Sequence, residues 1–337
     1  MQPRTLVWTD DTREAIVAEA SGILARGGLV AMPTETVYGL AARADSAEAC
    51  ARIYQAKRRP LSHPLIVHVA GVEAARALVL EHAHGLLAVW GNRFWPGPLT
   101  LVLPRSPRVL DAVTGGGPNV ALRCAAHPVM AAVLANIPFA LAAPSANRYQ
   151  GVSPTTAAHV AQSLGMACDL IIDGGPCSIG VESTIVLPSA SIGAPIGAAH
   201  GASRVLRLGG ISVETLRAFD PAIVVDAGTD AEDAVHAAPG RDRRHYAPRC
   251  DLAFVSHASG LPSPSTDIGY LTYDEALRPG YCLWKCLAND AEGYGRGLYA
   301  ALHEAESLGL QTLYVRVVPP GEAWATVRDR LARAGSH

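Results

Sequence analysis

Residues 29–69 read LVAMPTETVYGLAARADSAEACARIYQAKRRPLSHPLIVHV, and the order of patterns in this stretch decides the fold class. The apolar run 29–32 predicts a short buried strand, which ends at Pro33. Residues 47–56 have helical spacing, and the apolar run 64–69 predicts a second strand. Strand, turn, helix, loop and strand in that order predict an α/β domain with a twisted open sheet.

A polar turn follows the first predicted strand. Thr34, Glu35, Thr36 and Tyr38 bring hydroxyl groups and one carboxylate into a turn that Gly39 closes. Open α/β sheets bind ligands in the loops that follow their strands. We therefore expect this turn to line a site.

A basic loop follows the predicted helix. Lys57, Arg58 and Arg59 come directly before Pro60. Three cations beside a hydroxyl-rich turn indicate an anionic ligand, and a chain of phosphates is the simplest candidate.

Composition limits the class of protein. The 337 residues are 49% hydrophobic and 17% charged, which predicts two well-buried globular domains rather than one. The net charge of −2 gives no global field that would attract nucleic acid or an anionic membrane. The first residues, MQPRTLVWTD, lack the pattern of a signal peptide, and the apolar stretches are too short to span a bilayer. A soluble, cytoplasmic protein with no membrane association is expected.

The cysteines predict no metal site. Seven are scattered along the chain, and the odd number fits reduced thiols. Cys282 and Cys286 are the only close pair. Their spacing is wrong for a zinc hairpin, so we expect buried thiols and no bound metal.

Further polar groups follow predicted strands in the first half of the chain. Arg123 lies near the end of the strand 119–124, where alternation would point it either into a site or out from a strand edge. Ser145 and Asn147 follow a buried strand, and Ser153 before Pro154 has the pattern of a helix cap. A helix start beside these polar groups would bind an anion.

The second half begins as a connector. Residues 213–238 are helix-like and then irregular, and 239–248 read PGRDRRHYAP. Two prolines make this segment semi-rigid. Such a linker is usually a solvated spacer, but its arginines, His245 and Tyr246 are poor choices for a spacer. We expect it to fold over the site of the first domain as a lid.

From residue 250 a βαβ-type pattern predicts a small Rossmann-like domain.

These motifs resemble those of the threonylcarbamoyl-AMP synthases, a YrdC-like family, in its longer two-domain form. The family signature PTETVYGL is intact at 33–40, the K-x-R-P loop is at 57–60, and the PLIVHV strand is at 64–69. The TGG, PSAN, SPT, DGG, ESTIV and LRxGG segments follow in family order between 114 and 210. Two C-terminal segments, LYAALHEAESLG and RDRLARAG, match more loosely.

The resemblance implies a domain plan and a reaction. The plan is a YrdC-like catalytic domain over 1–212, a linker or lid over 213–249, and a C-terminal α/β domain over 250–337. The reaction is a nucleotidyl transfer in which L-threonine, bicarbonate and ATP give L-threonylcarbamoyladenylate and pyrophosphate, with Mg²⁺ on the leaving group. The product would pass to a separate transferase complex that forms N6-threonylcarbamoyladenosine at position 37 of tRNA.

Matching positions also imply site residues. Lys57 and Arg59 would be catalytic, because they would neutralise the phosphates. The other expected ATP contacts are His63, Asn119, Ser145, Asn147, Ser153, Arg207 and Tyr246. The expected threonine contacts are Thr36, His68, Arg123, Ser183 and the backbone near Ala143, with Arg123 holding the carboxylate. The family usually has asparagine at 63 and threonine at 119, so direct contacts from His63 and Asn119 stay open.

Two other functions compete with this one. A concave basic patch on such a domain could bind double-stranded RNA without catalysis, and weak RNA binding stays among the expected interactions. A balanced net charge and a hydroxyl-rich site weigh against it as the main function. A carbamoyltransferase of the same domain family is the second alternative, but those enzymes carry additional large domains.

Overall fold

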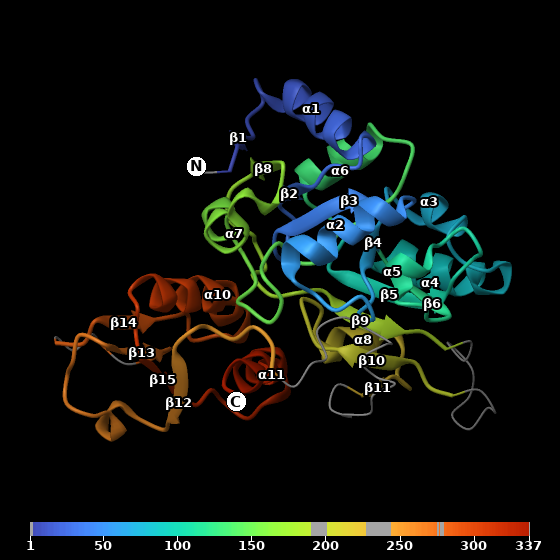
Figure 1. Ribbon diagram of the computed structural model, residues 1–337. Coiled ribbons are helices and arrows are strands. Elements are labelled where there is room, and N and C mark those ends of the chain that lie inside the picture. Colours follow the sequence, from blue (N-terminus) through green and yellow to red (C-terminus); the bar gives the residue numbers. More distant parts are fainter. Residues whose placement is uncertain (1–2, 190–200, 227–243, 275, 277–279, 337) are drawn as a thin grey trace.

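The structure is a computed structural model that describes residues 3–189, 201–226, 244–274, 276 and 280–336. Its described strands form an eleven-stranded sheet and a four-stranded sheet. The large sheet and its helices lie together, and the small sheet lies beside them with α10 (Ala291–Ser307) between the two parts (Figure 1). The predicted α/β class with a second small domain is confirmed.

The elements have the following bounds. The strands are β1 Thr5–Val7, β2 Val30–Met32, β3 Gly39–Arg43, β4 Ile66–His68, β5 Leu99–Pro104, β6 Asn119–Arg123, β7 Leu141–Ala142, β8 Leu170–Asp173, β9 Thr184–Leu187, β10 Arg204–Arg207, β11 Val224–Val225, β12 Asp251–Val255, β13 Ile268–Thr272, β14 Leu283–Cys286 and β15 Thr312–Arg316. The other α-helices are α1 Arg13–Ala25, α2 Ala47–Lys57, α3 Val72–Arg76, α4 His84–Phe94, α5 Asp111–Thr114, α6 Pro128–Ala135, α7 Ala157–Leu164, α8 Val213–Phe219 and α11 Ala325–Ala334.

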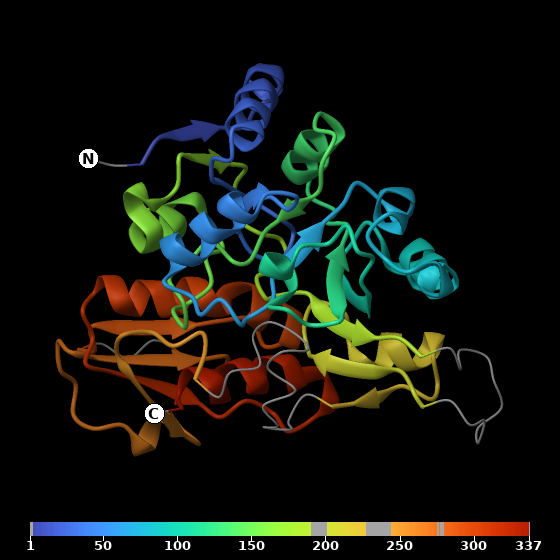
Figure 2. The ribbon, with the colours of Figure 1, turned by 45° about the vertical axis from the view of Figure 1, so that its right-hand side comes forward.

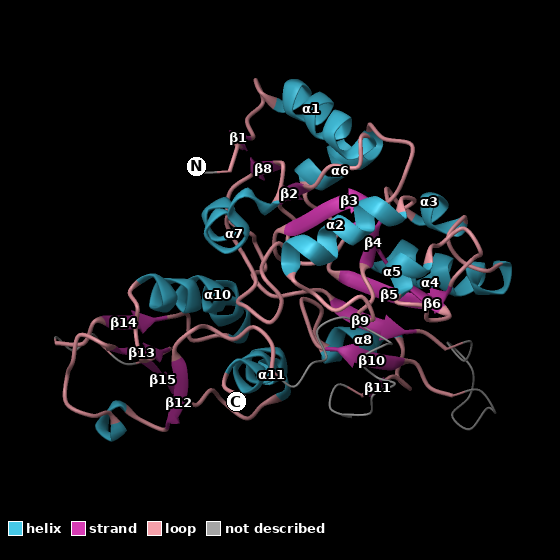
Figure 3. Ribbon diagram, in the orientation of Figure 1, coloured by secondary structure: helices cyan, strands magenta, loops and turns pink. Residues whose placement is uncertain are grey.

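The large sheet is mixed, and its middle strands position the site. Its order is β1-β8-β2-β3-β7-β4-β6-β5-β9-β10-β11. β2 and β3 form an antiparallel pair that starts at Met32 and Gly39, so the polar turn 33–38 joins them. β7 runs antiparallel to both β3 and β4. The end of β7 therefore reaches the polar turn, and Gly39 forms a bridge with Ser145 there. Figure 3 shows the strands β2, β3 and β4 of this sheet among the helices of the first domain.

Local signals fix α2 as the sequence predicts. The Ser46 hydroxyl accepts a hydrogen bond from the Ala49 amide at 3.2 Å and caps the helix. Arg58 has φ +54° and ends the helix in the left-handed conformation. This single residue turns the chain, so that Lys57 and Arg59 are both buried while Arg58 is exposed.

Two predictions about helices are wrong. The helical spacing of Ala, Leu and Val from Gly71 to Trp90 predicts a helix there. The structure splits this stretch into α3 and α4, because Val79 forms a bridge with Arg105 and draws the backbone toward β5. Ser153 does not cap a helix: α7 begins at Ala157, and Thr156 is its cap. The Ser153 hydroxyl instead donates to the Glu182 carboxylate at 2.7 Å, a stronger charge-assisted bond.

The small sheet is parallel throughout, in the order β12-β15-β13-β14. Its core includes Leu298 and Leu302 of α10, and the same cluster contains Val37 and Val152 from the first domain. The core of the small domain therefore extends across the seam, while the first domain also has core clusters of its own. Figure 2 shows α10 along the seam. At the other end of the large sheet β11 pairs with β10, so residues 213–226 pack with the first domain. Residues 227–243 of the predicted linker lie outside the described residues.

Candidate active site

A small cavity of about 50 Å³ lies where the polar turn, the end of β7 and the linker meet. Nine of the fourteen side chains or backbone positions expected at the site line it: Thr36, Arg59, His68, Arg123, Ala143, Ser145, Ser183, Arg207 and Tyr246. Thr34, Val37, Gly39, Ile66, Pro144, Glu182 and His245 complete the wall.

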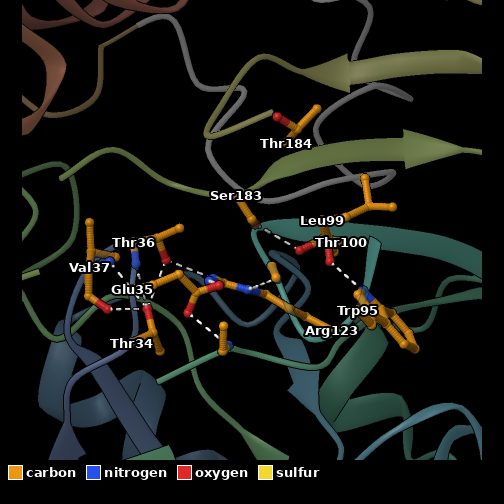
Figure 4. A network of polar contacts seen from close by, with 12 residues as sticks. Thr34, Glu35, Thr36, Val37, Trp95, Leu99, Thr100, Arg123, Ser183 and Thr184 are labelled. Atoms are coloured by element: carbon orange, nitrogen blue, oxygen red, sulfur yellow. Dashed lines mark hydrogen bonds and ion pairs between the residues drawn. The ribbon is translucent and has the colours of Figure 1, made fainter. Parts of the chain in front are cut away.

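Arg123 points into the site, not into solvent. It ends β6 and is buried. Its Nη2 donates to Glu35 Oε1 at 2.7 Å, its Nη1 to Thr36 Oγ1 at 2.8 Å, and its Nε to the Gly97 carbonyl at 3.3 Å (Figure 4). The second Glu35 oxygen accepts from the Ala126 amide at 3.1 Å. Glu35 thus fixes the guanidinium in a single orientation at the cavity wall.

The hydroxyl groups of the polar turn form a directed chain. Thr34 Oγ1 donates to the Val37 carbonyl at 2.7 Å, which commits its only proton. The bond of 2.8 Å between Thr34 and Thr36 must then be donated by Thr36. Thr36 Oγ1 consequently accepts from Arg123 and donates to Thr34, so the turn and the cation hold each other in place.

Ser183 brings another hydroxyl group to the cavity. Ser183 Oγ is 2.8 Å from Thr100 Oγ1 and accepts from Arg207 Nη2 at 3.1 Å. Arg207 also donates twice to the Ser183 carbonyl, at 2.9 and 3.2 Å. A second guanidinium, on β10, therefore reaches the cavity beside a hydroxyl.

The His68 imidazole lines the cavity in its neutral form. It is buried on β4, and its Nδ1 has no hydrogen-bond partner among the described residues. Burial, and secondly the charge of Arg123, lower the pKa of this imidazole to about 3. His68 therefore stays neutral at physiological pH and offers a polar nitrogen to a ligand.

Lys57 and Asn147 lie just behind the cavity wall. Lys57 Nζ donates to the carbonyl oxygens of Ser145 and Asn147 at 2.5 and 2.6 Å, which shapes the PSAN turn. Burial, and secondly Arg59, lower the pKa of the Lys57 ammonium well below its usual range. The Asn147 amide donates to two carbonyl groups, while its Oδ1 has no partner within the described part of the chain.

An aromatic group connects the basic loop to the linker. The Tyr149 ring meets His63 edge to face at 5.4 Å and His245 at 6.3 Å. Arg59 lies over the Tyr149 ring at 5.9 Å and donates to the Pro64 carbonyl at 3.1 Å. His63 thus lies next to the cavity-lining Arg59 without lining the cavity itself.

Asn119 is not brought to the cavity. It begins β6, and Arg123 ends the same strand, so roughly 13 Å of strand separates them.

The described end of the linker lies at the cavity. His245 and Tyr246 are buried, and both line it. Tyr246 has φ +61°, a strained conformation for a tyrosine, and its hydroxyl has no hydrogen-bond partner in the described ranges. Arg330 of α11 lies over the Tyr246 ring at 4.9 Å. The segment is therefore held against the site from the side of the C-terminal domain.

Glu182 joins the two domains at the edge of the site. Its carboxylate accepts from Arg330 Nε at 2.8 Å, from the Tyr299 hydroxyl at 2.9 Å and from the Ser153 hydroxyl at 2.7 Å. Burial alone would raise the pKa of Glu182, but Arg330 and Arg207 outweigh it and lower that pKa. Arg330 Nη2 also donates to the Leu208 carbonyl at 2.6 Å, next to Arg207.

The sequence motifs assign no role to five residues of this network: Glu35, Thr100, Glu182, Tyr299 and Arg330. Glu35 and Glu182 each stand inside a quoted motif, so a carboxylate beside hydroxyl residues was an available signal. Tyr299 and Arg330 carry no local signal, because their partners lie more than one hundred positions away.

In the described residues no three His, Cys, Asp or Glu side chains converge on a metal site. Cys282 and Cys286 are free thiols but exposed, so the prediction of burial was wrong.

Known proteins share both parts of this architecture. The family profile described as "Telomere recombination" matches residues 22–194, and the profile of the C-terminal domain of threonylcarbamoyl-AMP synthase matches residues 211–336. The chain is 40% identical to the threonylcarbamoyl-AMP synthase of Pyrococcus abyssi, over 94% of this chain and 93% of that protein.

The chain belongs to the threonylcarbamoyl-AMP synthase family. It is also 32% identical to the enzyme of Schizosaccharomyces pombe over 99% of this chain and 91% of that one. The crystal structure of Pyrococcus abyssi Sua5 complexed with L-threonine superposes with a TM-score of 0.82, at 30% identity, over 99% of this chain and 98% of that chain.

Membership defines the class of activity. The chain is an enzyme of the nucleotidyltransferase type, and enzymes of this family use ATP as a substrate. The described part of the chain contains no helix with the length and apolar character that a bilayer crossing requires.

Proposed function

We propose that this enzyme makes L-threonylcarbamoyladenylate from L-threonine, bicarbonate and ATP, with release of pyrophosphate. The observation that carries the proposal is the buried Arg123, oriented by Glu35 and Thr36 at the wall of a closed cavity. A guanidinium in that position suits the carboxylate of an amino acid. The related Sua5 structure was solved in complex with L-threonine, which supports the same ligand here.

The threonine subsite would use Thr36 and Ser183, two of the hydroxyl residues that line the cavity. Arg123 holds the carboxylate, while Ser183, His68 and the backbone near Ala143 surround the amine and side chain. The neutral imidazole of His68 accepts or donates a hydrogen bond without adding charge.

The cations of the site also prepare the amine. Arg123, Arg207 and Arg59 all line the cavity, and nearby positive charge lowers the pKa of an ammonium group. A neutral amine is the form that captures CO₂, which bicarbonate supplies by losing hydroxide. The nitrogen–carbon bond forms as the amine gives up a proton, and that proton and the hydroxide leave as water. The site would therefore favour the carbamate over protonated threonine.

ATP would approach from the basic loop. Arg59 and Arg207 line the cavity and are the side chains placed to neutralise its phosphates, while Lys57 supports the Ser145–Asn147 turn from behind. Mg²⁺ would be held mainly by the ATP phosphates. When bound there, Mg²⁺ neutralises the pyrophosphate leaving group.

The reaction is a displacement at the α-phosphorus. A carbamate oxygen forms a bond to that phosphorus, and the bond from it to the bridging oxygen of the β-phosphate breaks. Both reactants are anions, so the enzyme contributes mainly orientation and fixed positive charge.

The linker would act as the lid of this site. A cavity of about 50 Å³ is far below the roughly 300–1,000 Å³ of ordinary ligand pockets, so His245 and Tyr246 must move to admit ATP. Closure would keep water from the labile carbamate and acyl adenylate. The product would then leave for a separate transferase that modifies adenosine 37 of tRNA.

One experiment tests the proposal. The protein is incubated with ATP, Mg²⁺, L-threonine and labelled bicarbonate, and the mixture is analysed for a labelled acyl adenylate and for pyrophosphate. Both should appear, and each should require threonine. RNA affinity that falls steeply with salt, without formation of the adenylate, would favour the RNA-binding alternative.

A further inference from the structure

A second and larger cavity, of about 450 Å³, lies behind the strand that lines the active site. Ile66 and His68 face the active-site cavity, whereas Val67 and Val69 line the second one. This division follows from the alternation of side chains along β4. The two cavities are therefore separated by one strand and do not share a wall residue. The second has the size of an ordinary small-ligand site, roughly 300–1,000 Å³.

The second cavity is apolar, and its mouth is left open by small side chains. Ala70, Ala74 and Ala77 stand on and around α3 at the mouth, and all three are exposed. Leu78 and Phe139 are half-buried beside them. No side chain beyond a methyl group projects from the alanine positions, so this wall has room for the apolar body of a ligand.

The charges at the rim select the sign of the ligand. Asp45 and Arg108 are its charged lining residues. Asp45 is neutralised by Arg43, at 2.7 Å from Nε to Oδ1 and 2.9 Å from Nη2 to Oδ2. The guanidinium of Arg108 makes no hydrogen bond or ion pair with any residue that the structure describes, although its backbone amide bonds Ser106. The uncompensated charge at the rim is thus positive.

We propose that this cavity is a second ligand site, which takes an apolar molecule that carries one anionic group. The body fills the space between α3, β4 and Phe139, and the anionic group pairs with Arg108. Neither ATP nor threonine matches this chemistry, because both are polar over most of their surface. Since β4 separates the cavities, the second ligand binds together with the substrates and does not compete with them.

The probe for the test is 8-anilinonaphthalene-1-sulfonate, an aromatic anion whose fluorescence rises in apolar surroundings. It is titrated into the full-length protein, with and without saturating ATP and threonine. Ala74→Phe fills the mouth, and Arg108→Glu reverses the rim charge. Ala18→Phe, at an exposed alanine of α1, and Arg13→Glu, at an exposed arginine, are the matched controls.

We expect saturable binding of one probe per chain, weakened about tenfold or more by each cavity variant and unchanged in the controls. Octanoate should displace the probe, while octanol should do so weakly and octylamine not at all. Binding that is equal in Arg108→Glu, or that ATP and threonine abolish, would overturn the proposal. Arg108 is exposed, so its variant gives a clear answer even where Ala74→Phe fails to fold.

Discussion

Arg330 of α11 donates from Nε to Oε2 of Glu182 at 2.8 Å, although the two residues are 148 positions apart in the chain. The Arg330 side chain is 0% exposed and that of Glu182 is 7% exposed. The C-terminal domain therefore places a cation inside the first domain, against a carboxylate that lines the active-site cavity. The same guanidinium also donates to the Leu208 carbonyl, next to Arg207, and lies over the Tyr246 ring of the linker.

The first prediction concerns this buried pair. Arg330→Ala should lower the free energy of unfolding by about 3–5 kcal/mol, because it leaves the Glu182 carboxylate buried without its counter-ion. Urea unfolding followed by fluorescence measures the loss.

The control is another ion pair between the same two domains. Arg217 and Glu322 pair across the seam with side chains that are 48% and 49% exposed, so Arg217→Ala should cost no more than about 1 kcal/mol. Equal losses in the two variants would show that burial does not make the Arg330 pair special.

The second prediction separates neighbouring arginines of the basic loop. Arg59 is buried and lines the cavity, whereas Arg58 is exposed one residue earlier. Arg59→Ala should reduce kcat/KM for ATP by roughly tenfold to a hundredfold, the effect of one lost charge-assisted contact of about 1.5–3 kcal/mol. Arg58→Ala should keep the rate of the unmodified enzyme. Similar rates in both variants would remove Arg59 from the phosphate site.

Lys57, two positions before Arg59, supports the site from behind the cavity wall. Lys57→Ala removes two hydrogen bonds that hold the Ser145–Asn147 turn, so it should reduce both turnover and stability. Arg59→Ala removes the hydrogen bond to the Pro64 carbonyl, so it should reduce turnover with a smaller loss of stability than Lys57→Ala. Thermal unfolding of the two variants distinguishes a supporting role from a direct one.

The sequence predicts the local parts of this site and misses the long-range ones. The polar turn and the ends of α2 follow from patterns a few residues long. Strand alternation leaves the direction of Arg123 open, and its bonds to Glu35 and Thr36 decide it. The Ser153 cap was wrong because the Glu182 carboxylate, 29 positions away, is a better partner than a helix amide. The contacts of Arg330 depend on how two domains pack, and no pattern around residue 330 encodes that.

The third prediction concerns substrate selection. Valine has the shape of threonine without its hydroxyl group, and a cavity lined by Thr36, Ser183 and His68 would leave polar groups unpaired around it. Valine should therefore react about 10⁴-fold less efficiently in kcat/KM. Serine keeps the hydroxyl and lacks only the methyl group, so it should lose only about 10–200-fold. Pyrophosphate release with each amino acid measures the ratio, and comparable rates with valine would refute a site that binds the hydroxyl.

The fourth prediction concerns pH. The rings of His159 on α7 and His303 on α10 stack at 4.0 Å across the domain seam. Burial lowers the pKa of His159 to about 4, and burial, then the charge of His159, lowers that of His303 to about 3. In the unfolded chain both titrate near 6.5. Between pH 6.5 and about 4 the unfolded state therefore binds more protons than the folded state. The free energy of unfolding should fall as pH falls through this range.

Glu306 Oε2 lies 3.7 Å from His303 Nδ1 and would offset part of this loss. We expect urea unfolding midpoints to fall between pH 7 and pH 5, and to fall less in His303→Gln. His84→Gln is the control, because that histidine lies on α4, far from the seam. An identical pH dependence in His303→Gln and the unmodified protein would contradict the prediction.

The last prediction concerns Tyr246. Its ring is buried between Arg330 and the cavity, stacked at 5.7 Å on Tyr299, and its hydroxyl has no partner in the described part of the chain. Tyr246→Phe should therefore leave stability unchanged. It should raise KM for ATP about threefold to tenfold, since a neutral hydrogen bond to the nucleotide contributes about 0.5–1.5 kcal/mol. Tyr246→Ala also opens the lid, so ATP hydrolysis per adenylate formed should rise as water enters. Synthesis and hydrolysis measured together separate the two effects. Unchanged KM in Tyr246→Phe and unchanged coupling in Tyr246→Ala would show that the linker is a passive connector.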